Sequence, residues 1–117
     1  MQTNVQELAN DMNKMVSVGE LIKAGLKYYA PDIKTIEFDG RVTEGKQAAM
    51  KKLTDFVDSI EKVNEITLLR SSSDGNASFS ELILNLDMKD GTNITLHEIV
   101  RSLWKNGLVT EERYFKG

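Results

Sequence analysis

The chain has 117 residues, of which 40% are hydrophobic and 28% charged, and its net charge is −3. This length predicts one domain spanning residues 1–117, and this composition is typical of a globular protein rather than a disordered one. The acidic surplus, with no basic cluster longer than Lys51-Lys52, argues against nucleic acid as a partner. The chain contains no cysteine, which excludes disulfides, thiolate nucleophiles and zinc sites built on cysteine.

No segment predicts export or membrane insertion. Residues 1–15 contain no basic stretch followed by an apolar run, so we expect no signal peptide. No apolar run approaches the ~20 residues that a membrane-spanning helix needs. We therefore expect a soluble, cytoplasmic protein without a membrane partner.

The first half of the chain is predicted to be mainly helical. A first amphipathic helix is predicted from four apolar residues at helical spacing, namely Val5, Leu8, Met12 and Met15. Residues 17–20 (SVGE) match a capping box and predict the start of a second helix, which Pro31 would end. A short strand over residues 34–38 would place Ile36 and Phe38 on one face. A third helix would begin after a capping Thr43, with an apolar stripe of Ala49, Leu53, Phe56 and Ile60.

After Val63 the apolar period changes to two residues, which indicates strands. Asp74-Gly75, Asp90-Gly91 and Asn106-Gly107 are typical hairpin turns, and they separate four such strands. The second half therefore predicts an antiparallel meander. The predicted fold class is α+β, with helices packed on one face of a curved antiparallel sheet.

Four stretches resemble the family of nuclear-transport-factor-two-like domains, which includes ketosteroid isomerases and SnoaL-like polyketide cyclases. They are residues 16–20 (VSVGE), 28–32 (YYAPD), 44–49 (EGKQAA) and 104–109 (WKNGLV). The resemblance implies a single SnoaL-like domain over residues 1–117, with a cone-shaped antiparallel sheet wrapped around the helices as a cystatin-like α+β barrel. It implies an apolar pocket inside the sheet. It also implies a homodimer formed through the opposite face, where we expect Val100, Ser102 and Trp104.

The resemblance also locates the catalytic positions of the isomerases. Phe38 corresponds to the general base of the isomerases. Met12 corresponds to the tyrosine that binds the oxyanion, and Ile99 to a protonated acid. All three residues are apolar here, and a hydrocarbon cannot accept a proton or donate to an oxyanion. We therefore expect no isomerisation of Δ5-3-ketosteroids and assign no catalytic residue.

A shift of one residue would change that interpretation. It would bring Glu37 and Glu98 into two of these positions and would turn the other residues of each strand to the opposite face. Ile36 and Phe38 favour the unshifted alignment because they form an apolar pair on one face.

The last hairpin predicts which polar residues line the pocket. If its turn has two residues, Arg101 lies opposite Glu112 and Ile99 opposite Tyr114, and His97 shares their face. The resemblance identifies this face as the pocket. There Arg101 would anchor an anion or carbonyl, oriented by Glu112, with His97 or Tyr114 as proton donor. The alternative is an exposed ion pair of little energetic value.

The predicted ligand-binding residues are Met12, Phe38, His97, Ile99, Arg101, Glu112 and Tyr114. The single histidine lacks both an orienting partner and spaced carboxylates, so we expect neither a catalytic triad nor a metal site, and we expect no cofactor. The predicted function is binding of a small apolar or aromatic molecule, with a lyase, isomerase or cyclase reaction on an unknown substrate. The alternative is a non-catalytic, homodimeric interaction domain.

Overall fold

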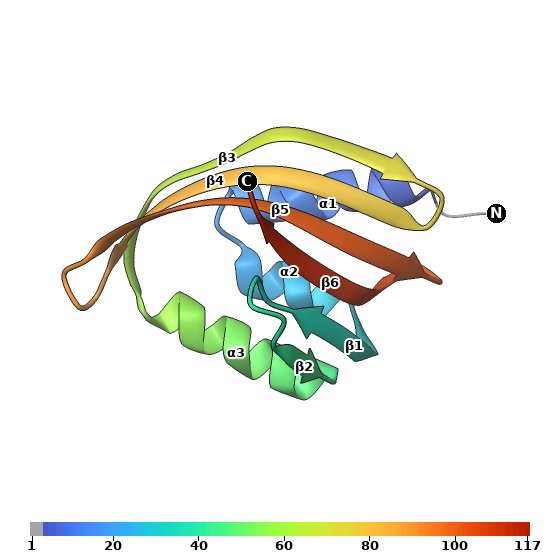
Figure 1. The fold of residues 1–117 in the computed structure, drawn as a ribbon, viewed down its shortest axis with the longest axis horizontal. Coiled ribbons are helices and arrows are strands. Elements are labelled where there is room, and N and C mark those ends of the chain that lie inside the picture. Colours follow the sequence, from blue (N-terminus) through green and yellow to red (C-terminus); the bar gives the residue numbers. More distant parts are fainter. Residues whose placement is uncertain (1–3) are drawn as a thin grey trace.

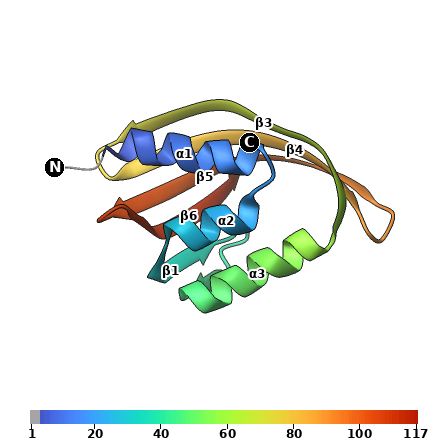
Figure 2. The same ribbon diagram turned by 180° about the vertical axis from the view of Figure 1, so that it is seen from behind.

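The structure is a computed structural model that describes residues 4–117. Its elements in chain order are α1 (Val5–Ser17), α2 (Leu21–Tyr28), β1 (Tyr29–Ile36), β2 (Val42–Glu44), α3 (Lys46–Asp58), β3 (Ile60–Asp74), β4 (Ala77–Met88), β5 (Asn93–Lys105) and β6 (Leu108–Lys116). The strands form one six-stranded sheet in the order β2-β1-β6-β5-β4-β3 (Figure 1). The sheet is curved and unclosed, and the helices pack against its concave face (Figures 1 and 2). The predicted α+β class is confirmed.

Strands β3 to β6 form the predicted antiparallel meander. Its three turns contain residues at positive φ, a conformation that Asn and Gly tolerate best: Gly75, Gly91, Asn106 and Gly107. Strand β1 departs from the prediction because it pairs in parallel with β6, while the short β2 pairs antiparallel with β1. The sheet is therefore mixed rather than entirely antiparallel.

The structure corrects the starts of two helices. Ser17 is the last residue of α1 and donates its hydroxyl to the carbonyl of Asn13 at 2.8 Å, so it does not cap α2. Helix α2 begins after Glu20 without a side-chain cap. Helix α3 begins after Gly45, whose φ of 91° suits glycine, whereas the predicted cap Thr43 lies in β2.

Strand β1 begins earlier than the sequence predicted. Helix α2 ends at Tyr28, β1 follows directly, and Pro31 lies within the strand instead of ending the helix. The predicted inward pair of Ile36 and Phe38 is only half correct, because Ile36 does not face the interior. Thr35 is the buried residue at this end of β1, whereas Ile36 is only partly buried and Phe38 is 44% exposed.

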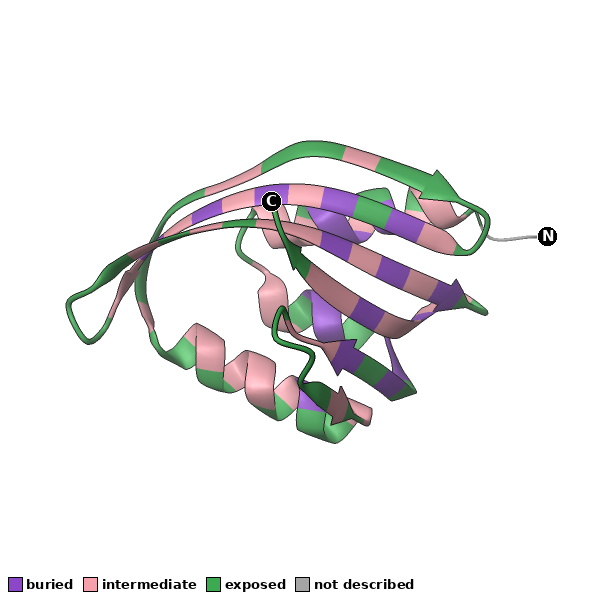
Figure 3. Cartoon of the chain, viewed as in Figure 1, coloured by how far each residue is buried: buried purple, intermediate pink, exposed green. Residues whose placement is uncertain are grey.

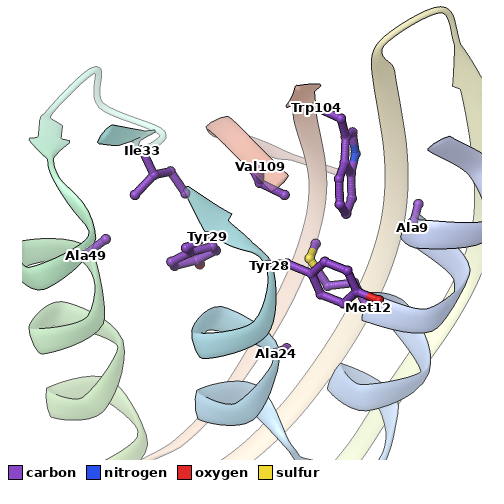
Figure 4. Packing of buried hydrophobic residues seen from close by; sticks show 9 residues of the cluster. All are labelled: Ala9, Met12, Ala24, Tyr28, Tyr29, Ile33, Ala49, Trp104 and Val109. Atoms are coloured by element: carbon purple, nitrogen blue, oxygen red, sulfur yellow. The ribbon is translucent and has the colours of Figure 1, made fainter. Parts of the chain in front are cut away.

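Trp104 belongs to the core between the helices and the sheet (Figure 4). Its ring contacts that of Tyr28 edge to face, with the centroids 5.5 Å apart, and its Nε1 donates to Oγ of Ser78 at 2.9 Å. Val100, Ser102 and Trp104 are all buried, so the face on which we expected a dimer interface is the interior face. None of the helices in residues 4–117 has the length and apolar character needed to cross a bilayer.

A β-bulge interrupts the last hairpin. Trp104 pairs with Val109, but the next pair is Leu103 with Glu111, which leaves Thr110 as an extra residue in β6. The hydroxyl of Thr110 donates to the carbonyl of Leu103 at 3.3 Å. Beyond the bulge every β6 residue therefore lies one position away from the partner that a simple two-residue hairpin would give it.

Candidate functional site

A cavity of about 500 Å³ lies between the helices and the concave face of the sheet. Helices α1, α2 and α3 contribute mainly apolar side chains, including Met12, Val16, Leu21, Leu53 and Phe56. The sheet adds Leu82, Leu84, Leu96 and Val100. The volume falls within the range of about 300–1,000 Å³ that is usual for small-molecule pockets.

Buried and more exposed side chains alternate along β4, and this pattern shows which residues of the paired strand β5 face the cavity. Alternate residues of β4 are buried from Ser78 to Leu86 (Figure 3). Residues that pair across two antiparallel strands lie on the same face. Leu82 pairs with Glu98 and Leu84 pairs with Leu96, so Glu98 faces the cavity together with the leucines.

Three predicted ligand-binding residues lie on the outer face instead: His97, Ile99 and Arg101. Nε2 of His97 is 2.6 Å from Oε2 of Glu81, and Arg101 forms an ion pair with Glu111. None of the three lines the cavity, so the predicted facing is wrong. Alternation shows which residues share a face, but it does not show which face is the interior.

The other four predicted ligand-binding residues, Met12, Phe38, Glu112 and Tyr114, do line the cavity. Glu112 does not face Arg101 as predicted: because of the bulge, it pairs with Ser102 on the inner face. Tyr114 pairs with Val100 for the same reason. Whether these residues bind a ligand stays a prediction.

Glu98 is the distinctive polar residue of the cavity. Among the described residues its carboxyl has no hydrogen-bond or ion-pair partner, and its side chain is partly buried in an apolar wall. Burial raises its pKa from 4.5 to about 7, helped by the charges of Glu112 and Glu37. A carboxyl in this state can both lose and gain a proton near neutral pH.

Glu112 is fully enclosed and bound by two tyrosines. Its Oε1 accepts hydrogen bonds from the hydroxyl of Tyr29, at 2.8 Å, and from that of Tyr114. Burial raises the pKa of Glu112, and the two hydrogen bonds partly oppose that rise. Burial and the charge of Glu112 raise the pKa values of both tyrosines well above the usual 10, so both phenols keep their protons.

A second polar cluster lies where α3 meets β1. Nζ of Lys52 forms an ion pair with Glu37 and donates to Oγ1 of Thr35, at 2.8 Å, and to Oγ1 of Thr43, at 3.4 Å. Glu37 and Lys52 both line the cavity and neutralise each other. Within residues 4–117 no group of three side chains is placed to hold a metal ion.

The sequence analysis missed Tyr29 and Lys52 and disfavoured Glu37 and Glu98. A signal for Glu98 was present. The leucines of β4 mark the apolar face, and counting pairs from the turn at Asp90-Gly91 places Glu98 on the same face as Leu82. No comparable signal identified Lys52, whose position depends on how α3 packs against β1.

The fold matches solved structures, although no model of a known protein family and no curated protein matches the sequence. A protein from Mesorhizobium loti described as a SnoaL-like polyketide cyclase superposes with a TM-score of 0.84 at 26% identity, covering 97% of this chain and 99% of the other. An uncharacterised cystatin-fold protein from Novosphingobium aromaticivorans superposes with a TM-score of 0.82 at 12% identity. The match covers 98% of this chain and 100% of the other. An NTF2-like protein of unknown function from Burkholderia pseudomallei superposes with a TM-score of 0.79 at 11% identity. The match covers 99% of this chain and 92% of the other.

Other matching structures have a ketosteroid isomerase-like or SnoaL-like fold. The chain therefore has the fold of the nuclear-transport-factor-two-like superfamily, to which the SnoaL-like and ketosteroid isomerase-like proteins belong. Because this fold serves unrelated activities, the function has to be argued from the cavity.

Proposed function

We propose that this protein binds a small, largely apolar molecule in the cavity and that Glu98 exchanges a proton with it. The observation that carries the proposal is a carboxyl without a protein partner, set in an apolar wall, with a pKa of about 7. A general acid or base is most effective when its pKa lies near the working pH. The proposed reaction class is an isomerase, lyase or cyclase reaction, in which a proton leaves one atom and another atom gains one.

The rest of the cavity supports this role. Its walls are mainly apolar, so a bound molecule would displace water and would meet Glu98 in a medium of low polarity. Glu112 cannot take the same role easily, because it is enclosed and already bound to Tyr29 and Tyr114. Glu37 is paired with Lys52. Glu98 is thus the carboxyl of the cavity that remains free to act on a ligand.

A deuterium-exchange experiment tests this proposal. A thermal-shift screen of steroids, polyketide fragments and aromatic compounds first supplies molecules that bind. Each is then incubated with the protein in D2O, and deuterium uptake at carbon is followed by mass spectrometry. We expect exchange with the wild-type protein and a loss of about 10²- to 10⁴-fold in rate for Glu98→Gln, the range typical of one acid–base group.

The matched control for that experiment is His97→Ala, because His97 is the neighbouring residue and faces outward. Its exchange rate should equal that of the wild-type protein. Unchanged exchange in Glu98→Gln, or a loss confined to His97→Ala, would contradict the assignment of Glu98.

We also propose that the chain forms a homodimer through the outer face of the sheet. Phe79 and Phe115 are 38% and 40% exposed there, and Ile99 is partly buried between polar neighbours. Exposed large apolar side chains on one face are typical of an interaction surface. A dimer of this kind leaves the cavity on the inner face free, so it is compatible with ligand binding.

A further inference from the structure

The two tyrosines of the cavity already donate their hydroxyl protons to a protein acceptor. Tyr29 and Tyr114 both donate to Oε1 of Glu112. A phenol has one proton to donate and two lone pairs to accept with. Each tyrosine oxygen can therefore accept a hydrogen bond from a ligand, but neither hydroxyl can donate to one without breaking its bond to Glu112.

The ammonium of Lys52 is committed in the same way. An ammonium carries three protons, and Lys52 directs its donors to Glu37, Thr35 and Thr43. Thr35 is itself only 2% exposed. All three protons of the Lys52 ammonium are therefore donated to protein acceptors. A ligand carbonyl or carboxylate would have to displace one of these partners.

The remaining donors on the wall are poorly placed to meet a ligand. Ser80 donates to Oδ1 of Asn13 at 3.1 Å, and both residues are buried, as is Ser102. Arg41 lies on the exposed turn after β1, where its Nε pairs with Asp39 at 2.8 Å. These donors line the cavity but are nearly buried or, for Arg41, largely exposed to solvent.

Acceptors, by contrast, face the cavity. In its ionised form Glu98 presents two carboxylate oxygens without a partner among the described residues, and Tyr114, which also lines the cavity, keeps free lone pairs on its hydroxyl. The two residues are diagonal neighbours on adjacent strands, because Glu98 pairs with Lys116 and Val100 pairs with Tyr114. The Cα atoms of diagonal neighbours lie roughly 7–8 Å apart, so both residues can line the same part of one bound molecule.

From this distribution we infer that the cavity selects a largely apolar molecule that brings its own hydrogen-bond donor, a hydroxyl or an amine, to Glu98, with the oxygen of Tyr114 as a second acceptor nearby. This inference rests on the proposed function, because it takes the cavity to be the binding site. The local charges point the same way: after burial, the carboxylate charges of Glu112 and Glu37 oppose the ionisation of Glu98, so a further negative charge beside it is disfavoured. A donor is therefore favoured there over an anionic substituent.

Four compounds on one naphthalene ring test the inference: 2-naphthol, the aminomethyl compound, the methyl ketone and the carboxylic acid. Their dissociation constants are measured by calorimetry at pH 8, where Glu98 is mainly ionised. We expect the hydroxyl or the aminomethyl compound to bind at least about tenfold more tightly than the ketone and the carboxylate, which corresponds to one good hydrogen bond. The tighter of the two donor compounds shows whether a neutral hydroxyl or a cation is preferred.

The preference should disappear in Glu98→Gln, because the new amide is neutral and offers donors of its own. Glu61→Gln is the matched control, since Glu61 is exposed on β3 and does not line the cavity, and it should keep the wild-type order. Equal or tighter binding of the ketone or carboxylate by the wild-type protein would overturn the inference and leave the proposed binding function intact. Failure of all four compounds to bind would contradict both.

Discussion

Glu98 and Glu112 face the same cavity from adjacent strands, and their environments give them opposite properties. Glu112 is enclosed and holds two tyrosine hydroxyls, whereas Glu98 has no protein partner among the described residues. Burial first, and the charge of Glu112 second, raise the pKa of Glu98 to about 7. One carboxyl is thus fixed in a hydrogen-bond network, while the other is free to exchange a proton.

The raised pKa of Glu98 predicts a dependence of stability on pH. A carboxyl whose pKa is higher in the folded than in the unfolded protein favours folding fully below the unfolded value of 4.5, and this contribution is lost as pH rises through about 7. Glu98→Gln stays neutral at every pH. We expect it to match the wild-type protein at pH 4 and to be more stable at pH 8 by roughly 1–3 kcal/mol. Urea denaturation at both pH values measures this, and a difference independent of pH would contradict it.

Tyr29→Phe should destabilise the protein, because it removes one of the two hydroxyls that satisfy the buried Glu112. The expected loss in the free energy of unfolding is about 1–3 kcal/mol, the cost of leaving a buried polar group unsatisfied. Tyr28→Phe is the control, since Tyr28 donates to Asp11, whose side chain is 44% exposed and can turn to water. We expect a loss below about 1 kcal/mol there. A loss for Tyr29→Phe no larger than that for Tyr28→Phe would show that the Tyr29 hydroxyl does not stabilise Glu112.

We expect no isomerisation of Δ5-3-ketosteroids above background, but for a different reason from the one that the sequence suggested. Acids do face the cavity, namely Glu37, Glu98 and Glu112. What is missing is a free tyrosine hydroxyl for the developing oxyanion: the sequence resemblance assigns the position of the isomerase tyrosine to Met12, and Tyr114 donates to Glu112. An absorbance assay for the conjugated ketone tests this. Turnover that disappears in Glu98→Gln would show that a donor is available.

The proposed dimer predicts a mass near twice 13.2 kDa by light scattering at micromolar concentration. Phe79→Glu should give the monomer, because it places a charge in the apolar outer face. Val18→Glu is the control: Val18 is 65% exposed but lies between α1 and α2, away from the sheet. A monomer mass for the wild-type protein, or dissociation by Val18→Glu alone, would contradict an interface on the outer face.

Local sequence signals were sufficient for the α+β class and for the meander of β3 to β6. Apolar spacing located the helices and these strands, and three turns with Gly at positive φ located the hairpins, but no local signal predicted β2 or the parallel pairing of β1 with β6. Helix starts were less predictable. Ser17 and Glu20 match a capping box, yet α1 continues through Ser17, because the hydroxyl bonds back to Asn13 instead. A capping sequence does not distinguish the end of one helix from the start of the next.

The candidate site was less predictable because its polar residues depend on strand register. The extra residue Thr110 moves Glu112 away from Arg101 and places it opposite Ser102, and turn residues alone do not indicate such a bulge. The register of β5 could have been predicted from the sequence by counting pairs across the preceding hairpin, in which Leu82 pairs with Glu98. The one-residue shift that the sequence analysis disfavoured therefore describes the cavity better than the alignment that it preferred.

The measurement that tests the account most directly is the pH titration of the Glu98 side chain. Carbon-13 NMR follows each glutamate carboxyl separately, and the signal missing from Glu98→Gln identifies that of Glu98. The account predicts a midpoint of about 7 in the ligand-free protein. A midpoint near 4.5, the ordinary value for glutamate, would show that Glu98 is solvated and would remove it as the proton-exchanging group of the cavity.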